Sequence, residues 1–300
     1  MLMRALAAIV VVVLSTGGSL AGPFEDGVAA HERGEYAAAH RLLRPLAERG
    51  VAGAQANLGI MYDNGQGVPQ DDAEALTWYR LAAEQGNAVA QTNLGFMYAY
   101  GRGVSQDDAK ALKWYGLAAA QGMATAQFNL GNNYHNGRGT PQNDVEAVRW
   151  YRLAAEQGLD DAQLNLGVMY AEGNGVAKDN TEAAKWFRRA AVWGNANAQY
   201  NLGNSYANGE GVPQDDVEAD KWYRLAAEQG QPNAQYDLGL SYARGDGVPQ
   251  DYVQAHMWFD LAALQGGVDA AKYRDIAAGM MSPDQIARAQ EMVRGWLAAH

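Results

Sequence analysis

A strict period of 36 residues runs through most of this chain. Leu-Gly pairs recur at that spacing from Leu58-Gly59 to Leu238-Gly239 without a slip. A tyrosine four residues after each leucine and a tryptophan twenty residues after it keep the same register, at Tyr62, Tyr98, Tyr134, Tyr170, Tyr206 and Tyr242 and at Trp78, Trp114, Trp150, Trp186, Trp222 and Trp258. Six copies in one register indicate a tandem array in which each unit packs on its neighbours.

The first half of each unit predicts an amphipathic helix. Ala54, Leu58 and Tyr62 are spaced four residues apart and therefore share one face. Gly59 lies on the same side, where glycine costs about 1 kcal/mol relative to alanine, so we expect another helix to approach closely there. The helix should end at Gly65, because Gly65-x-Gly67 can adopt left-handed conformations.

The second half predicts another helix that begins at Asp71. The Asp71 carboxylate can cap free backbone N–H groups, and Glu74 can complete a capping box. The same pairing recurs at Asn143 and Glu146, Asp179 and Glu182, and Asp215 and Glu218. The predicted buried stripe, which includes the tryptophan series, consists of Ala75, Trp78, Tyr79 and Ala82.

The two ends of the array depart from the pattern. Residues 22–50 predict a degenerate helix pair and residues 267–300 predict closing helices, so both are interpreted as caps on the six repeats of residues 51–266. In the last helix, Ser282-Pro283 offers an N-cap followed by proline at the first helical position, and Gln285 stands at the third. Trp296 is expected to close the core.

Residues 1–21 have the form of an export signal. A positive Arg4 precedes the apolar run 5–14, and Ser19-Leu20-Ala21 suits cleavage after Ala21. The run is too short to span a bilayer comfortably, although an uncleaved N-terminal anchor is the alternative. We expect a periplasmic or secreted bacterial protein with no stable membrane insertion after cleavage.

The repeat resembles a known family. The strings Ala90-Gln91-x-Asn93-Leu94-Gly95-x-x-Tyr98, Gly101-x-Gly103-Val104 and Ala111-x-x-Trp114-Tyr115-x-x-Ala118-Ala119 are similar to Sel-one-like repeats, which are relatives of the tetratricopeptide repeats. This resemblance implies an all-α fold, a right-handed α/α superhelical solenoid of tandem helix-turn-helix repeats. It also implies a role in protein assembly.

Composition and spacing argue against several functions. A net charge of −11 and a pI of about 4.9 disfavour nucleic acid as a partner. No cysteine is present, so the disulfides of the related Helicobacter cysteine-rich proteins, and a Cys-based site, are excluded. No histidine has a metal or triad spacing, and the Gly-x-Gly pairs follow helices and lack the downstream lysine of a phosphate loop. We therefore predict no catalytic residue, cofactor or metal site.

One surface is left for binding. If positions 54, 58, 59 and 62 face inward, positions 53, 56, 57, 60 and 64 line the concave groove that stacked first helices form. The groove should carry asparagines and aromatics, with Asp237 in place of the sixth asparagine: Asn57, Asn93, Phe96, Tyr100, Phe128, Asn129, Asn165, Tyr200, Asn201, Asn204 and Tyr236. Amides can bond both faces of an extended peptide backbone, and aromatics supply apolar anchors.

In tetratricopeptide relatives the matching asparagine holds the backbone of a bound peptide. The resemblance implies the same role for the five asparagines that directly precede a Leu-Gly pair, which are Asn57, Asn93, Asn129, Asn165 and Asn201. The competing interpretation is that asparagine bonds neighbouring repeats. The leading hypothesis is a non-catalytic scaffold or regulator of the bacterial envelope with a protein or peptide in the groove. The alternatives are an enzyme acting on peptidoglycan or β-lactams, and a glycan-binding module for which peptidoglycan would be the partner.

Overall fold

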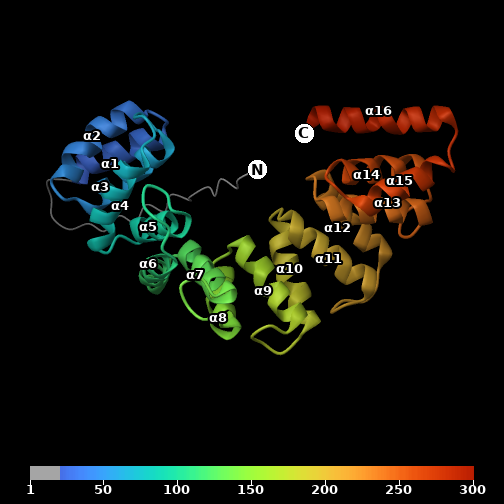
Figure 1. The fold of residues 1–300 in the computed structure, drawn as a ribbon, viewed down its shortest axis with the longest axis horizontal. Coiled ribbons are helices and arrows are strands. Elements are labelled where there is room, and N and C mark those ends of the chain that lie inside the picture. The colour runs from blue at the N-terminus through green and yellow to red at the C-terminus, as the bar shows by residue number, and fades with distance from the viewer. Residues whose placement is uncertain (1–20) are drawn as a thin grey trace. The chain divides into compact units, whose positions relative to one another are not determined.

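The computed structural model of the protein describes residues 21–300 and, within them, sixteen α-helices and no strand (Figure 1). Consecutive helices pair in tandem, which confirms the predicted all-α solenoid of helix-turn-helix repeats. Apart from Ala21, the predicted export signal lies outside the described residues. The helices are α1 (Ala21–Glu32), α2 (Tyr36–Glu48), α3 (Ala52–Asn64), α4 (Asp72–Glu84), α5 (Ala88–Tyr100), α6 (Asp108–Ala120), α7 (Ala124–Asn136), α8 (Asp144–Glu156), α9 (Asp160–Glu172), α10 (Asn180–Val192), α11 (Ala196–Asn208), α12 (Asp216–Glu228), α13 (Pro232–Arg244), α14 (Tyr252–Leu264), α15 (Val268–Ala278) and α16 (Pro283–Ala299).

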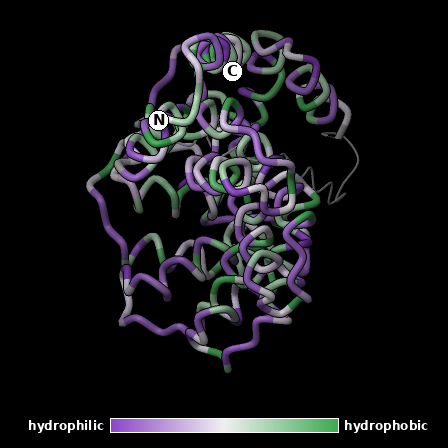
Figure 2. Tube along the Cα trace, turned by 90° about the vertical axis from the view of Figure 1, so that its right-hand side faces the viewer, coloured by the Kyte–Doolittle hydropathy of each residue, from purple (hydrophilic) through white to green (hydrophobic). Residues whose placement is uncertain are grey.

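The chain forms two compact units. Unit 1 contains α1–α6 and ends at Gln121, and unit 2 begins at Gly122 and contains α7–α16. Inside each unit every helix packs against the helix before and the helix after it in sequence, except that α16 packs on α14. Figure 2 shows hydrophobic and hydrophilic residues interspersed along the helical coils, as expected for helices that bury one face.

The two glycines between paired helices have separate tasks. Gly65 has a φ of 67° and ends α3 in the left-handed conformation, as predicted. Gly67 has a φ of 73°, and a Cβ there would lie 2.7 Å from the carbonyl carbon of Tyr36 at the start of α2. The second glycine therefore also allows the loop to rest on the preceding second helix.

The second helices begin at the predicted N-caps, but without the predicted capping box. Asp71 accepts hydrogen bonds from the backbone N–H groups of Ala73 and Glu74. In the later repeats the glutamate at the third position pairs instead with a cation one turn on, as Glu218 does with Lys221 at 2.6 Å. In the described chain the reciprocal box forms in α16 alone, where Ser282 and Gln285 were predicted to start the helix.

The interior of each pair is built on the tyrosine of the second helix rather than on the tryptophan. Tyr79, Tyr115 and Tyr151 are at most 2% exposed. The close approach expected at the Leu-Gly glycine is made by this ring: a Cβ on Gly95 would lie 2.7 Å from Cδ1 of Tyr115. Each tryptophan comes one position before this tyrosine, or before the phenylalanine in its place, and packs at the edge of the stripe. Trp186 and Trp258 are buried, and the other four are half-buried: Trp78, Trp114, Trp150 and Trp222.

A buried glutamine links successive repeats. Gln91 Nε2 donates to the carbonyl oxygen of Ala83 at 3.1 Å, and Gln91 Oε1 accepts from Gln121 Nε2 at 2.7 Å. The arrangement recurs elsewhere, for example at Gln199 with Gln229. Such bonds matter because a buried amide without partners costs about 1–3 kcal/mol.

Repeat four breaks this linkage. The position of Gln121 and Gln229 is taken by Trp193, which is 80% exposed, and Gln163 Oε1 is buried without a hydrogen-bond partner. We predict that Trp193→Gln raises the free energy of unfolding by about 1 kcal/mol, because the new amide can donate to Gln163. Urea denaturation measures the change. The reverse substitution in the next repeat, Gln229→Trp, should lower the free energy of unfolding. If the two substitutions change the free energy of unfolding in the same direction, the linking role of the glutamine is contradicted.

At the N-terminal end α1 and α2 form a helix pair, whereas at the C-terminal end α15 and α16 both pack on α14. Leu43 and Leu46 of α2 are buried where the repeats carry their aromatic stripe, and Trp296 of α16 packs half-buried against the core of α12–α14. Within residues 21–300 no helix combines the length and apolarity that crossing a membrane requires.

Candidate functional site

The eleven predicted groove residues all lie on first helices of the repeats, and we call them the inner-face row. Ten of them are half-buried and Tyr100 alone, at 61%, is exposed. The prediction that this side of the helix is open is wrong at three positions of the first two repeats, where Ala56, Ile60 and Thr92 are buried. These side chains are small or apolar.

In unit 1 the row serves the protein's own structure. Asn57 Nδ2 donates to the carbonyl oxygen of Gly53 at 2.8 Å, one turn earlier in α3. Asn93 hydrogen-bonds the hydroxyl of Tyr79, whose pKa burial raises well above its usual value. The rings of Phe96 and Tyr100 contact each other with centroids 4.4 Å apart. The asparagines here support the structural interpretation.

The same holds for the part of unit 2 around α7–α9. Asn165 Nδ2 donates to Asn132 Oδ1 at 3.3 Å, and the Tyr151 hydroxyl donates to the same oxygen at 2.7 Å. Burial raises the pKa of Tyr151 to about 12, although its hydrogen bond with Asn165 opposes the rise. Phe128 packs against the Tyr151 ring at 5.9 Å. Asn165 is therefore held by partners inside the protein.

The aromatic members toward the C-terminus also have internal partners. Tyr200 packs at 6.0 Å on the ring of Tyr223, whose hydroxyl donates to Asn204 Oδ1 at 2.7 Å. Tyr236 packs between Phe259 and Tyr273 at 5.8 and 5.7 Å. Burial is the main reason that the pKa values of Tyr200, Tyr223 and Tyr236 are raised.

Asn201 differs from Asn57, Asn93 and Asn165. Asn129 likewise has no side-chain hydrogen-bond partner among the described residues, but it does not line the pocket described below. The hydroxyl that Asn93 and Asn165 bond belongs to a tyrosine fourteen residues earlier, but fourteen residues before Asn201 the chain has Phe187. Among the described residues the Asn201 side chain has no hydrogen-bond partner; only its backbone oxygen is engaged, by the Ser205 hydroxyl at 3.0 Å. Its amide donor and acceptor are free to bind a ligand.

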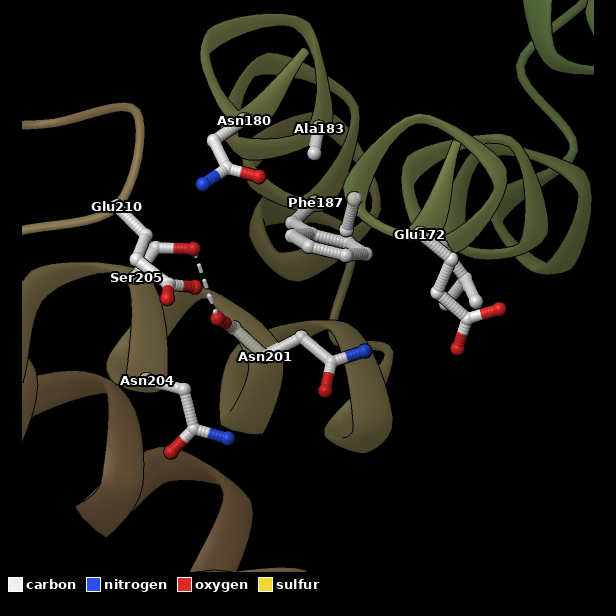
Figure 3. Close-up of a pocket in the computed structure, with 10 residues that line it drawn as sticks. Glu172, Asn180, Ala183, Phe187, Asn201, Asn204, Ser205 and Glu210 are labelled. Atoms are coloured by element: carbon white, nitrogen blue, oxygen red, sulfur yellow. Dashed lines mark hydrogen bonds between the residues drawn. The ribbon is translucent and has the colours of Figure 1, made fainter. Parts of the chain in front are cut away.

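The free amide lies at a pocket between α9, α10 and α11 (Figure 3). In that view Phe187 lies between Glu172 on one side and Glu210 on the other, with Asn201 and Asn204 below the ring. The cavity volume is about 210 Å³, which is smaller than a typical small-molecule site and comparable to the space for one side chain. Four apolar and six polar residues line it: Val168, Ala171, Ala183 and Phe187, and Glu172, Asn180, Asn201, Asn204, Ser205 and Glu210.

The pocket exists because repeats four and five carry smaller side chains than their counterparts. Moving each position back by 108 residues, three periods, shows what fills the same place in unit 1. Phe187, Asn204 and Ser205 correspond there to Tyr79, Phe96 and Met97, and Tyr79 and Met97 are each 1% exposed. Loss of this bulk opens the space in front of Asn201.

Prediction from the sequence found two of the lining residues, Asn201 and Asn204, and missed the other eight. The missed polar residues, Glu172, Asn180, Ser205 and Glu210, stand at positions that vary between repeats, whereas the asparagine before each Leu-Gly pair recurs. An alignment of the six repeats against one another contains the signal, since several departures from the repeat lie together at this pocket.

The chemistry that the pocket offers is recognition. Amide and hydroxyl groups can exchange hydrogen bonds, the carboxylates can accept them, and Phe187 offers an apolar face. Among residues 21–300 no group of three or more histidine, aspartate or glutamate side chains is placed to hold a metal ion.

Comparisons with known proteins agree with the repeat architecture. The Sel1 repeat family matches residues 52–87, 88–123, 124–159, 160–191, 196–231 and 232–267. A solved Sel1 repeat protein from Oxalobacter formigenes is 35% identical over 80% of this chain and 96% of that one, with a TM-score of 0.73. The protective antigen c5321 of uropathogenic Escherichia coli, described as displaying an SLR fold, is 32% identical over 94% of this chain and 69% of that one, with a TM-score of 0.62. The comparison with curated proteins found no match.

Proposed function

Because the chain belongs to the Sel1 repeat family, whose members generally mediate protein–protein interactions, we propose that it is a non-catalytic scaffold that binds an extended segment of a partner protein. The observation that carries the proposal is the free amide of Asn201 at a pocket of one side chain's size. An extended peptide has an N–H and a C=O at every residue and needs both donors and acceptors from its binding surface.

The export signal and the cell envelope belong to the same proposal. Residues 1–21 have the charge and apolar pattern of a cleavable signal, and a protein antigen is among the similar structures. We expect the exported protein to begin at Gly22, which intact-mass measurement of the periplasmic or secreted protein tests. A mass that includes residues 1–21 would contradict cleavage and favour an anchor.

Two asparagines separate a binding role from a structural one. Peptides can be selected from a display library on the immobilised protein, and their affinity then measured for Asn201→Ala and Asn165→Ala. We expect Asn201→Ala to weaken binding at least tenfold, or about 1.4 kcal/mol, while unfolding stability stays within about 0.5 kcal/mol.

Asn165→Ala serves as the matched control. It removes hydrogen bonds to Asn132 and Tyr151 and should cost about 1 kcal/mol of stability, with a smaller effect on peptide affinity. If no peptide is selected, or if Asn201→Ala leaves affinity unchanged, binding through Asn201 is refuted.

A further inference from the structure

The pocket of Figure 3 occupies a place that an ion-pair cluster fills in unit 1. There Arg102, in the loop after α5, reaches across to the preceding helix pair. Its Nη2 lies 2.6 Å from Asp63 Oδ1 and 2.5 Å from Asp72 Oδ1. The Tyr79 hydroxyl donates to Asp63 Oδ2 at 3.3 Å. A guanidinium thus ties the loop of one repeat to both helices of the previous one.

All three charged residues are replaced three periods later. Asp63, Asp72 and Arg102 correspond to Ala171, Asn180 and Glu210, and all three of these line the pocket. The place of the guanidinium is therefore empty, and the residue that would have supplied it is an acid. Among the described residues Glu210 makes no ion pair through its side chain.

The groups left around the vacant place suit a cation. Glu210 and Glu172 stand on opposite sides of Phe187 (Figure 3), and the lining contains no basic residue. Glu172 accepts one hydrogen bond, from Asn174 Nδ2 at 2.6 Å, and keeps further lone pairs. Asn180 and Asn201 offer amide oxygens, and the Phe187 ring presents a face on which a planar guanidinium can stack.

We propose that this pocket takes an arginine side chain of the partner, in the place that Arg102 occupies in unit 1. This inference rests on the proposed function, because it specifies one residue of the bound segment. Arginine is favoured over lysine because its flat guanidinium can stack on Phe187 and also donate to carboxylate and amide oxygens in its own plane.

The test uses a small probe, so it does not depend on finding a peptide. N-acetyl-arginine amide is titrated into the 15N-labelled protein while the side-chain amide signals of Asn201 and Asn204 are followed. We expect saturable shifts, and at least fivefold weaker binding of N-acetyl-citrulline amide, which has the same shape without the charge. Glu210→Gln should weaken arginine binding at least threefold.

The matched variant rebuilds the unit 1 cluster in unit 2. Ala171→Asp, Asn180→Asp and Glu210→Arg together should fill the pocket with the protein's own guanidinium and abolish the shifts. Equal binding of citrulline, no saturable shift with arginine, or unchanged binding by Glu210→Gln would each overturn the inference. If the arginine test fails in one of these ways but selected peptides still need Asn201, the proposed function stands and only the arginine inference fails. If the arginine test fails and no peptide can be selected, the arginine inference and the proposed function both fail.

Discussion

Replacing Gly95 by alanine is expected to destabilise the protein by up to about 2 kcal/mol. Alanine gains about 1 kcal/mol from helix propensity, but its Cβ would lie 2.7 and 2.8 Å from Cδ1 and Cε1 of Tyr115. That ring is 2% exposed, so it is enclosed by protein and cannot turn out into solvent without unpacking. Overpacking of this kind costs about 1–3 kcal/mol and occasionally more, so the steric term should outweigh the propensity gain. Urea denaturation measures the difference.

Gly116 is the matched control in the same unit. It lies inside α6, and a Cβ there would meet nothing within 4 Å. Gly116→Ala should therefore stabilise by up to about 1 kcal/mol. Shortening the ring as well, in Gly95→Ala with Tyr115→Leu, should cost less than the sum of the two single changes. Additive costs, or destabilisation by Gly116→Ala, would contradict the packing role assigned to the Leu-Gly glycine.

Replacing Asp220 by asparagine is expected to stabilise the protein above pH 6, by up to about 3 kcal/mol. Asp220 is 4% exposed, and its Oδ2 has no hydrogen-bond partner. The same position holds an apolar residue in earlier repeats, such as Leu76 and Val148. Burial is the largest reason that the pKa of Asp220 rises to about 6; Asp216 and Asp246 add to the rise, while Ser241 and Arg224 oppose it.

The sign of the pH effect follows from that raised pKa. The folded protein holds the proton more tightly than the unfolded chain, so the aspartate is tolerated at low pH and becomes costly as pH rises toward and past 6. The stability difference between Asp220→Asn and the unaltered protein should be near zero at pH 4 and reach its full value by about pH 7. Glu228→Gln, at an exposed end of the same helix, should show no such trend. A difference that does not change with pH would refute this account.

The architecture could be predicted from the sequence because each repeat encodes it locally. Asp71 and Gly65 act on neighbours a few residues away, Gly59 faces Tyr79 of its own repeat, and six copies in register exclude chance. Details that depend on which of two partners a side chain prefers could not be predicted. Glu218 can bond backwards to the helix start or forwards to Lys221, and the ion pair forms instead of the capping box.

The candidate site was only partly predictable for a related reason. The asparagines before each Leu-Gly pair look alike in sequence, yet Asn165 bonds inside the protein and Asn201 does not. Fourteen positions earlier the chain offers the Tyr151 hydroxyl to Asn165 but only the Phe187 ring, which has no hydroxyl, to Asn201. That pairing becomes visible only when the contact between repeats is known. Recurrence indicates packing, and the candidate site lies where several departures from the repeat meet at one pocket.

The central claim is that a partner polypeptide binds at Asn201. A photo-reactive residue placed at Val168, which lines the pocket with Asn201, and separately at the exposed Val217 of α12, can be activated by light in cells that make the protein. The account predicts a crosslinked polypeptide from position 168 that is absent at position 217 and is lost when the cluster of Asp63, Asp72 and Arg102 is rebuilt at Ala171, Asn180 and Glu210. No crosslink at position 168, or the same products at both positions, would contradict it.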